Sequence, residues 1–498
     1  MSQQPQQPLS ALYRPSLTLL TDLYQLTMAY GYWRQGMQDQ EAVFHLYFRK
    51  APFQGGYAVA AGLAYAVDWL ENLRFSEDDL TYLGSLRGSK GGVLFEQGFL
   101  DYLRDLRFTC DVDAVAEGTV VFGNEPLMRI QGPLIQAQLV ETALLTLVNF
   151  QTLIATKAAR IREAVGPNDQ ILEFGLRRAQ GFDGGLSATR AAYLGGADGT
   201  SNVLAGQQFG IPVKGTHAHS WVMAFDDEEE AFEKYAAAFP DDSVFLVDTY
   251  DTLEGVRNAI KVARRLRSQG HELGGIRLDS GDLTYLSVQA RKLLDEAGFP
   301  KVRIVASNDL DEQLVTALKL EGARIDTWGI GTKLVTAYDQ PALGGVYKLA
   351  AMRKTDGSGG WDYTIKLSEQ LAKTSIPGIL QVRRFYHDGK PVADMLYNTA
   401  EPLPEQLTIV DPLDATRRRP VQSAEFRELL EPLFRQGRRV LELPPLQESR
   451  QKARQEVTSL DPSIRRFLNP HTYPVGLEKG LHDFRTQLIL ERRPQRPA

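Results

Sequence analysis

The sequence predicts an α/β fold in which an irregular (β/α) barrel is flanked by an N-terminal α+β domain and a C-terminal mixed extension. The first indication is that short apolar runs alternate with amphipathic helical stretches from about residue 140 to residue 350, as in repeated βα units. The second is that several of these runs are apolar on both faces, which is typical of a parallel sheet covered by helices. Seven such units favour a barrel over an open sheet, which is the alternative arrangement.

Composition and periodicity change along the chain of 498 residues, which is long enough for about three domains. The changes predict a disordered lead-in at 1–15, the α+β domain at 16–139, the barrel catalytic domain at 140–365 and a β-hairpin and helical region at 366–498. The lead-in is rich in Gln and Pro and lacks the apolar core of a secretion signal. It is therefore predicted to be a disordered segment rather than a cleaved leader.

The individual elements follow from periodicity and from the turn residues between them. In the α+β domain, a helix is expected at 21–32 and strands at 42–48 and 113–116. The barrel strands are expected at 170–174, 192–195, 211–214, 244–247, 275–278, 303–306 and 327–330. Helices are expected at 252–270 and 283–297, because apolar residues recur there near helical spacing.

The C-terminal region shows a different pattern. Residues 379–386 are predicted to form one arm of a hairpin, because Asp388–Gly389 follows them as a turn signal. Helices are predicted at 423–436 and 446–458, and the tail at 492–498 is expected to fray.

The bulk composition excludes several classes of protein. Net charge is −6 and the isoelectric point is about 5.8, whereas a nucleic-acid binder usually carries a basic excess. The single cysteine, Cys110, cannot form an intrachain disulfide, and no 18-residue apolar stretch indicates a membrane span. We therefore expect a cytoplasmic protein that binds neither nucleic acid nor membrane, with the basic run at 417–419 as a solvated turn.

Polar clusters follow four of the apolar runs, at 214–221, 277–282, 307–309 and 329–333. In a (β/α) barrel, chemistry gathers where the strands end, so we expect these clusters to form one shared site. The cluster at 214–221 contains His217 and His219, which are two residues apart. A metal-binding pair, a structural histidine and a reactive histidine that takes a proton or phosphoryl group all fit this segment.

Arg277 and Asp279 alternate on a predicted strand and therefore face the same side. The arginine can fork a carboxylate or phosphate, and the aspartate can hold a sugar hydroxyl or bind Mg²⁺ through water. Ser280 and Gly281 would open the following helix, whose first amides attract an anion. The structural alternative is a buried Arg–Asp pair followed by a helix cap.

The remaining strand ends are weaker indications. Gly331 and Thr332 lie in a glycine-rich turn that can approach a phosphate or simply join a strand to a helix. Asn308 is equally compatible with a plain helix cap. Phe174 can stack on a flat ring and Arg177 can fork an acid group, but the alternatives are a core aromatic and a surface charge.

Taken together, five segments closely resemble nicotinate phosphoribosyltransferase, a type II phosphoribosyltransferase. They are 21–28, 173–181, 215–220, 277–282 and 329–332, within a match that runs from Leu19 to Lys373 and extends more loosely to the C-terminus. The resemblance implies an ATP-dependent enzyme of NAD salvage that joins nicotinate to 5-phosphoribosyl 1-diphosphate, with Mg²⁺ as the metal. It places a catalytic phosphohistidine at His219, whereas His217 falls on a variable position.

The resemblance also implies roles for individual residues. The implied nicotinate contacts are Tyr24, Phe174, Arg177, Thr216 and Arg277, and the implied contacts to phosphoribosyl diphosphate are Ser280, Gly281, Asn308, Gly331 and Thr332. Asp279 is implied to be catalytic and to serve as an indirect Mg²⁺ ligand. A homodimer is implied, since Tyr24 would reach the site of the neighbouring subunit. The alternatives are a nicotinamide or quinolinate phosphoribosyltransferase and a non-catalytic nucleotide-binding barrel.

Overall fold

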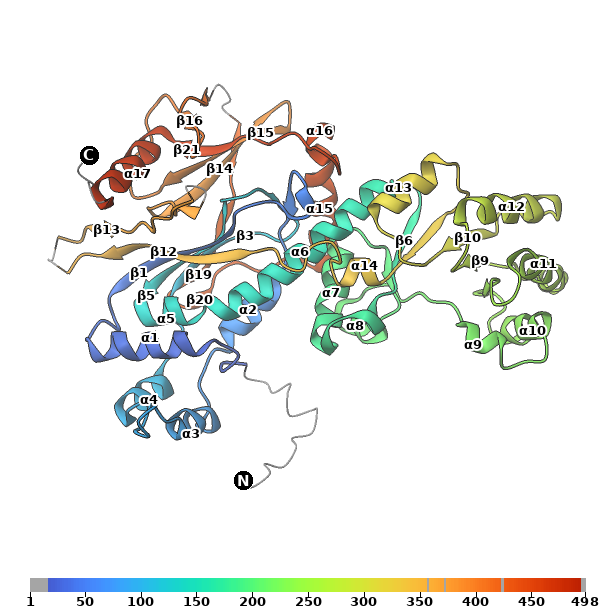
Figure 1. Ribbon diagram of the computed structural model, residues 1–498, viewed down its shortest axis with the longest axis horizontal. Coiled ribbons are helices and arrows are strands. Elements are labelled where there is room, and N and C mark those ends of the chain that lie inside the picture. Colours follow the sequence, from blue (N-terminus) through green and yellow to red (C-terminus); the bar gives the residue numbers. More distant parts are fainter. Residues whose placement is uncertain (1–16, 356–357, 371–372, 422–424, 494–498) are drawn as a thin grey trace.

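A computed structural model describes residues 17–355, 358–370, 373–421 and 425–493 (Figure 1). The predicted lead-in at 1–15 and most of the predicted frayed tail lie outside the described residues. The chain is elongated, with two sheets of mainly antiparallel strands in one lobe and the parallel barrel strands in the other (Figure 1). The predicted α/β fold with an N-terminal and a C-terminal part is confirmed, and the parallel strands of the predicted barrel form a sheet that is not closed by hydrogen bonds among the described residues.

The N-terminal sheet is antiparallel and draws its strands from widely separated parts of the chain. Its order over the described residues is β13-β12-β1-β5-β3-β19-β20. The strands are β1 (Glu41–Phe48), β3 (Asp111–Val115), β5 (Pro126–Pro133), β12 (Gly345–Arg353), β13 (Trp361–Tyr363), β19 (Leu430–Arg435) and β20 (Arg438–Arg439). A separate pair joins β2 (Ala58–Val59) and β4 (Val120–Val121). Because β12 pairs with β1 and β13 pairs with β12, residues 345–363, which the prediction placed in the barrel domain, belong to the N-terminal sheet.

The C-terminal sheet has the order β17-β16-β21-β15-β14-β18 in the described part of the chain. Its strands are β14 (Leu380–His387), β15 (Lys390–Asn398), β16 (Thr408–Val410), β17 (Arg418–Pro420), β18 (Phe426–Glu428) and β21 (Val475–Glu478). The predicted hairpin is β14 and β15, with Asp388 and Gly389 both at positive φ between them, as a tight hairpin turn requires.

The helix predicted at 423–436 is wrong over its described residues, which form β18 and β19 instead. Pro432 would break a helix at this point, because it removes a backbone donor and clashes with the preceding turn. Pairing with β3 decides the conformation, and that contact joins residues more than 300 positions apart in the sequence.

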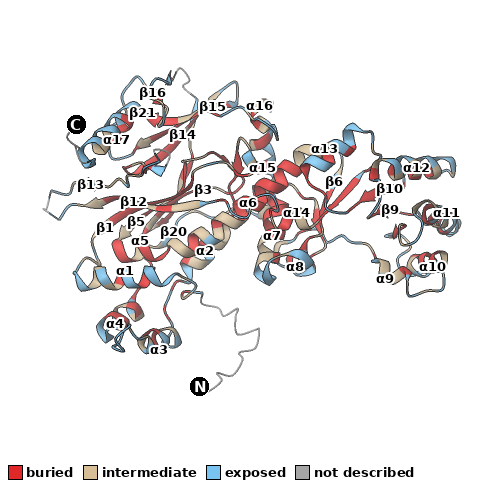
Figure 2. Ribbon diagram, in the orientation of Figure 1, coloured by how far each residue is buried: buried red, intermediate tan, exposed pale blue. Residues whose placement is uncertain are grey.

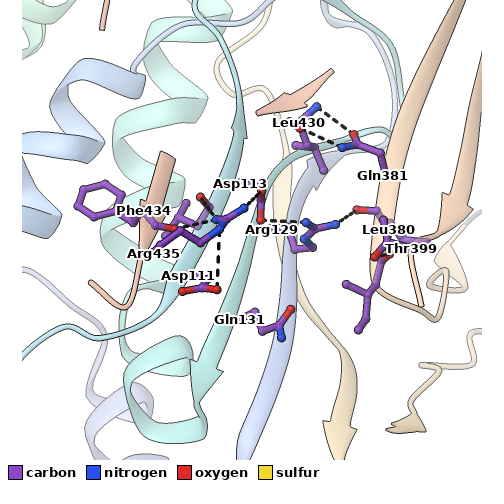
Figure 3. A network of polar contacts seen from close by, with 12 residues as sticks. Asp111, Asp113, Arg129, Gln131, Leu380, Gln381, Thr399, Leu430, Phe434 and Arg435 are labelled. Atoms are coloured by element: carbon purple, nitrogen blue, oxygen red, sulfur yellow. Dashed lines mark hydrogen bonds and ion pairs between the residues drawn. The ribbon is translucent and has the colours of Figure 1, made fainter. Parts of the chain in front are cut away.

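Buried polar contacts link the N-terminal and C-terminal sheets (Figure 3). Arg129 on β5 donates to Asp113 Oδ2 at 2.9 Å and to the Leu380 carbonyl at 2.8 Å, and Arg435 donates to Asp113 Oδ1 at 2.7 Å. His45 Nε2 accepts from the Leu380 amide at 3.2 Å. These contacts anchor the start of β14 to the N-terminal sheet.

The barrel sheet is parallel, with the order β7-β6-β11-β10-β9-β8 among the described residues. Its strands are β6 (Gln170–Glu173), β7 (Gly199–Thr200), β8 (Val244–Leu246), β9 (Gly275–Leu278), β10 (Arg303–Ala306) and β11 (Thr327–Ile330). The strands predicted at 170–174, 244–247, 275–278, 303–306 and 327–330 are therefore confirmed.

Two predicted barrel strands are wrong. Residues 192–195 form the last turn of helix α7 (Gly181–Gly195), whose final residues are buried on every side. A short apolar run of this kind does not distinguish a strand from a fully buried helix. Residues 211–214 contribute only one bridge, from Val213 to Thr200, since Pro212 has no amide hydrogen to donate.

The barrel is irregular because its hydrogen-bonded sheet ends at β8 on one side and at the Val213 bridge on the other. His217 lies across this gap, where its Nε2 accepts from the Leu246 amide of β8 at 3.2 Å. A side chain therefore replaces the missing backbone pairing between the two edges.

Helices surround these sheets, and the long helix α6 passes between the two lobes (Figure 1). The longer helices are α1 (Leu23–Arg34), α2 (Leu63–Glu71), α3 (Glu77–Ser85), α4 (Gln97–Asp105), α6 (Glu141–Val165), α10 (Glu228–Ala238), α11 (Thr252–Ser268), α12 (Leu283–Glu296), α13 (Glu312–Leu320), α15 (Leu446–Ser459) and α17 (Lys479–Arg492). The short ones are α5 (Leu134–Leu139), α8 (Val203–Phe209), α9 (His219–Val222), α14 (Thr332–Val335), α16 (Pro462–Arg465), η2 (Pro52–Gln54) and η3 (Leu176–Arg178). The helices predicted at 21–32, 252–270, 283–297 and 446–458 correspond to α1, α11, α12 and α15.

The stretch Leu134–Val165, which contains α5 and α6, is long and apolar enough to cross a membrane by length and composition alone. Most of that apolar window is buried inside the protein. Burial of α6 between the two lobes accounts for its composition, and Figure 2 shows this helix largely in red.

Candidate active site

The carboxyl ends of four neighbouring barrel strands bring predicted site residues to one edge. Because β6, β11, β10 and β9 are adjacent and parallel, the residues at or after their ends lie side by side. Phe174 follows β6, Ser307 follows β10, Gly331 follows β11, and Arg277 lies within β9. The expected convergence of strand-end clusters is therefore present in the structure.

Arg277 is the hub of this edge. Its Nε donates to Ser307 Oγ at 2.8 Å, its Nη1 to Thr216 Oγ1 at 2.9 Å and its Nη2 to Asp279 Oδ1 at 2.8 Å. The guanidinium carbon lies 5.5 Å from the centre of the Phe174 ring. Three oxygens and one aromatic face thus hold the guanidinium in a single orientation.

Asp279 is held as a carboxylate. Burial alone would raise its pKa, but the hydrogen bond from Ser307 and the charge of Arg277 hold the pKa of Asp279 below its ordinary value. Its backbone amide donates to Asp248 Oδ2 at 2.9 Å. The side chain is therefore charged and fixed at neutral pH.

His219 begins helix α9 and faces the same carboxylate. Its Nε2 lies 3.7 Å from Asp279 Oδ2, and its Nδ1 lies 3.2 Å from Thr249 Oγ1. The side chain retains 41% of its possible exposure, so a ligand can reach it. This histidine is both oriented by its neighbours and accessible, as a reactive histidine must be.

His217, two residues earlier, has the opposite environment. It is buried, packs on Tyr235 and Phe245, and accepts from the Leu246 amide. Burial lowers the pKa of His217 to about 4, so the ring is neutral at physiological pH. Of the interpretations that the sequence left open, the structural one fits His217.

Two glycines make room for Phe174. A Cβ on Gly329 would lie 2.8 Å from Phe174 Cδ2, and a Cβ on Gly331 would lie 3.1 Å from the Phe174 carbonyl oxygen. Thr332 follows directly as the first residue of α14. The glycine-rich turn therefore seats the aromatic ring against β11, which sequence spacing did not indicate.

Ser280, Gly281 and Asn308 are exposed along the same edge. Ser280 Oγ donates to Asp248 Oδ2 at 2.6 Å, and Gly281 has a φ of 78°. Asn308 has a φ of 110°, which is uncommon for a residue with a side chain and more common for asparagine than for most others. These two positive φ values set the course of the loops that follow β9 and β10.

Two predicted residues lie apart from this cluster. Arg177 is exposed in η3, one turn after Phe174. Tyr24 lies on α1 in the other lobe, where it lines a groove of about 330 Å³ with Thr142 and Phe150 (Figure 1). Within one chain, no contact between Tyr24 and Arg277 is present among the described residues.

Asp248 and Thr249 belong to the site but were missed in the sequence. Asp248 receives hydrogen bonds from the Asp279 amide and the Ser280 hydroxyl, and Thr249 contacts His219. They directly follow the apolar run at 244–247, so the rule that found the other clusters also applies to them.

The carboxylates here do not form a complete metal cage. No group of three or more His, Cys, Asp or Glu side chains suited to a metal is present in the described part of the chain. Asp248 Oδ1 is nevertheless buried without a hydrogen-bond partner among the described residues. The donor set fits Mg²⁺ only where most ligands come from water and substrate phosphates, which is the usual arrangement for this ion.

Comparisons with known proteins agree with this geometry. Family models described as the nicotinate phosphoribosyltransferase (NAPRTase) N-terminal domain, the NAPRTase family and the NAPRTase C-terminal domain match residues 19–149, 170–360 and 380–485. A nicotinate phosphoribosyltransferase of Bacillus subtilis (strain 168) is 45% identical over 483 residues, covering 96% of each chain. One from Homo sapiens is 38% identical over 534 residues, covering 96% of this chain and 97% of that one.

Solved structures show the same relationship. The crystal structure of human nicotinic acid phosphoribosyltransferase matches with a TM-score of 0.81 and 36% identity, covering 94% of this chain and 99% of that chain. A nicotinate-nucleotide pyrophosphorylase from Pyrococcus furiosus shares the fold at a TM-score of 0.68 and 20% identity, covering 92% of this chain and 99% of that chain. Site geometry, family models and full-length relatives agree, and the chain belongs to the nicotinate phosphoribosyltransferase family.

Proposed function

We propose that this chain joins nicotinate to 5-phosphoribosyl 1-diphosphate and couples the reaction to ATP hydrolysis through a phosphate on His219. The ribose C1–O bond to diphosphate breaks, and a bond forms from C1 to the ring nitrogen, giving nicotinate mononucleotide. ATP and water become ADP and phosphate in the same cycle. The observation that carries this proposal is the contact set of Arg277, which joins Thr216, Asp279 and the Phe174 ring at one edge.

Nicotinate is a flat ring bearing a carboxylate, and the edge offers a partner for each part. The face of Phe174 suits the ring, and Arg277 with Thr216 suits the carboxylate. The pyridine nitrogen already has a free lone pair, so attack on C1 needs orientation rather than a strong base. Arg177, exposed in η3 three residues after Phe174, would add positive charge at the approach to this edge.

The phosphoribosyl diphosphate would lie along the exposed edge. We assign its contacts to Ser280, Gly281, Asn308, Gly331 and Thr332. Asp279 would hold ribose hydroxyls and, through water, Mg²⁺, with Asp248 as a second carboxylate nearby. When bound, the metal would neutralise charge that builds on the departing diphosphate.

His219 is suited to accept a phosphoryl group at Nε2. A hydrogen bond from Nδ1 to Thr249 Oγ1 would leave the Nε2 lone pair directed toward Asp279 and the open edge. The γ-phosphoryl group would move from ATP to Nε2 as the bond to ADP breaks. Water would later hydrolyse the phosphohistidine to phosphate and the free imidazole.

The His219→Ala variant tests this assignment. We expect slow formation of nicotinate mononucleotide to continue, with loss of stimulation by ATP and of acid-labile phosphate on the protein. His387→Ala, at a histidine exposed on the C-terminal hairpin, is the matched control and should behave as the wild type. Full ATP coupling in His219→Ala would refute the assignment.

Tyr24 supports a homodimer with a shared site. On α1, Leu23, Tyr24 and Met28 are exposed, and Tyr24 and Met28 lie four residues apart, which suits a helix face that another surface covers. Tyr24 of the partner subunit would then cover the nicotinate ring opposite Phe174. Such a dimer would operate in the cytoplasm.

Mixing two variants that each lack ATP-stimulated activity tests the sharing. Tyr24→Ala and His219→Ala damage different subunits' contributions to one site, so mixed dimers would contain one intact site. We expect ATP-stimulated formation of nicotinate mononucleotide to reappear on subunit exchange, to about one quarter of the wild-type level for random mixing of equal amounts. Mixtures with no more ATP-stimulated activity than either parent, with subunit exchange demonstrated, would contradict the shared site.

A further inference from the structure

We propose that a cavity at the amino-terminal end of the barrel strands binds a phosphorylated small molecule, separately from the candidate active site. The cavity has a volume of about 570 Å³ and lies between α6, the end of α7, α15 and α16. Asp198 in its wall accepts from the Ile171 amide at the start of β6, whereas Phe174 follows the other end of that strand. The cavity and the candidate active site therefore lie at opposite ends of the same strand.

The lining of the cavity carries an excess of positive charge. Guanidinium groups of Arg162, Arg450, Arg454 and Arg465 face only two carboxylates, those of Glu163 and Asp198. Burial lowers the pKa of Arg162, and the charges of Arg450 and Arg454 act in the same direction against Asp198. An anion would relieve this imbalance.

Two of these arginines, Arg162 and Arg450, form hydrogen bonds within the protein. Arg162 donates to the Gly196 carbonyl at 2.8 Å, and Arg450 donates to Asp198 Oδ1 at 2.6 Å. Arg162 also donates to Asp198, so one carboxylate serves two arginines. These contacts join α6, α7 and α15 and make the cavity a preformed feature.

Two other arginines have unused hydrogen-bonding capacity. Arg465 donates from Nη1 to Glu163 at 2.5 Å, but its Nε is buried without a partner among the described residues. Arg454 is exposed at the cavity, and its guanidinium makes no hydrogen bond or ion pair within the described ranges. These side chains, from α16 and α15, can together hold a phosphate, whose oxygens match guanidinium donors.

The size and composition of the cavity favour more than a bare ion. Its volume is in the range of sites for small organic ligands, and Ala159, Pro167, Ala453 and Val457 supply apolar wall. A molecule with a phosphate and a flat or apolar portion, such as a nucleoside phosphate, matches this combination of charge and surface.

Photoaffinity labelling with 8-azidoadenosine 5′-monophosphate, followed by peptide mapping, tests the proposal in the full-length protein. We expect labelled peptides from 159–167 or 446–459, and we expect excess inorganic phosphate to suppress that labelling. Because a charge-assisted hydrogen bond to phosphate is lost, Arg454→Glu should weaken labelling there roughly tenfold or more. Arg454→Lys, which keeps the charge, should retain most of it.

Controls separate this site from the candidate active site. Arg264→Glu reverses an exposed charge on α11 and should label as the wild type does. Any labelling of peptides from 277–282 or 329–333 should be unchanged in Arg454→Glu. The proposal is overturned by labelling confined to those two segments, by wild-type labelling of the cavity in Arg454→Glu, or by undiminished labelling in excess phosphate.

Discussion

Two Arg–Asp pairs of similar geometry have different surroundings in the two lobes. At the barrel edge, Arg277 and Asp279 form an ion pair at 2.8 Å with side chains 18% and 32% exposed. In the C-terminal sheet, Arg384 and Asp394 form one at 2.6 Å with both side chains at 0%. The first pair leaves Asp279 Oδ2 facing His219, whereas Tyr473 and Glu456 enclose the second.

The difference shows that burial, rather than residue type, separates a site from a structural cluster. Burial and the charge of Asp394 raise the pKa of Glu125 well above its ordinary value, so ionisation of a second carboxyl there is disfavoured. Arg129, Asp113 and Arg435 form a further mostly buried group between the sheets (Figure 3). Such groups link strands, and only the pair with an open side can meet a substrate.

The largest effect is expected from Arg384→Met. Loss of the guanidinium leaves Asp394 buried without its counter-charge, while Glu456 keeps its ion pair with Arg427 at 2.7 Å. We expect a cost of about 3–5 kcal/mol in the free energy of unfolding. Urea titration measures this loss, and Arg384→Met with Asp394→Leu should recover part of it. If the single variant lost less than about 1 kcal/mol in the free energy of unfolding, the buried pair Arg384–Asp394 would not differ from Arg277–Asp279 in its importance for stability.

Arg277→Ala should affect activity instead of stability. We expect about 2–3 kcal/mol of lost transition-state stabilisation, seen as a fall in kcat/KM for nicotinate, because a bidentate ionic contact is removed. Steady-state kinetics with nicotinate as the varied substrate, together with urea titration, separates the two effects. An unchanged kcat/KM with reduced stability would make this pair structural as well.

His217 sharpens the comparison through pH. Its pKa is lowered by burial from 6.5 to about 4, so the unfolded chain binds a proton that the folded chain excludes in this window. The contribution of neutral His217 to the free energy of unfolding is complete above pH 6.5 and is lost as pH falls toward 4. The free energy of unfolding should therefore fall by about 2 kcal/mol between pH 7 and pH 5.

Stability of the wild type and of His217→Asn, measured at both pH values, tests this contribution. The buried His45, with its pKa lowered to about 3, remains in both proteins and supplies the background slope. An equal pH dependence in the variant would exclude His217 as the source.

The smallest effect is expected in the basic run at 417–419, which is exposed as predicted but in which Arg418 and Arg419 belong to strand β17 rather than to a turn, because they pair with β16. Arg417 is 76% exposed and pairs only weakly with Asp414 across 3.4 Å. Arg417→Ala should shift the free energy of unfolding by less than about 0.5 kcal/mol, because solvent already screens the charge. Denaturation at low and high salt measures this change in the free energy of unfolding. A large loss would show that the exposure of a charge does not determine how much it contributes to stability.

Much of the barrel could be predicted from local sequence. The strands ending at Leu278, Ala306 and Ile330 are apolar runs closed by polar residues, and each of these features is local. The predictions for residues 192–195 and for the described part of 423–436 were wrong, because the buried helix in the first segment and the paired strand in the second depend on distant partners. The importance of Asp248 depends on a contact with the Asp279 amide, 31 positions away.

The sequence by itself determined the family resemblance, the strand ends and the residue types available for binding a phosphorylated sugar and an aromatic acid. Only the tertiary structure decided that His217 is buried and neutral while His219 is accessible. It also decided which Arg–Asp pair faces solvent. The physical reason is that charge state and reactivity depend on desolvation, and desolvation is set by chain segments that pack together from far apart in the sequence.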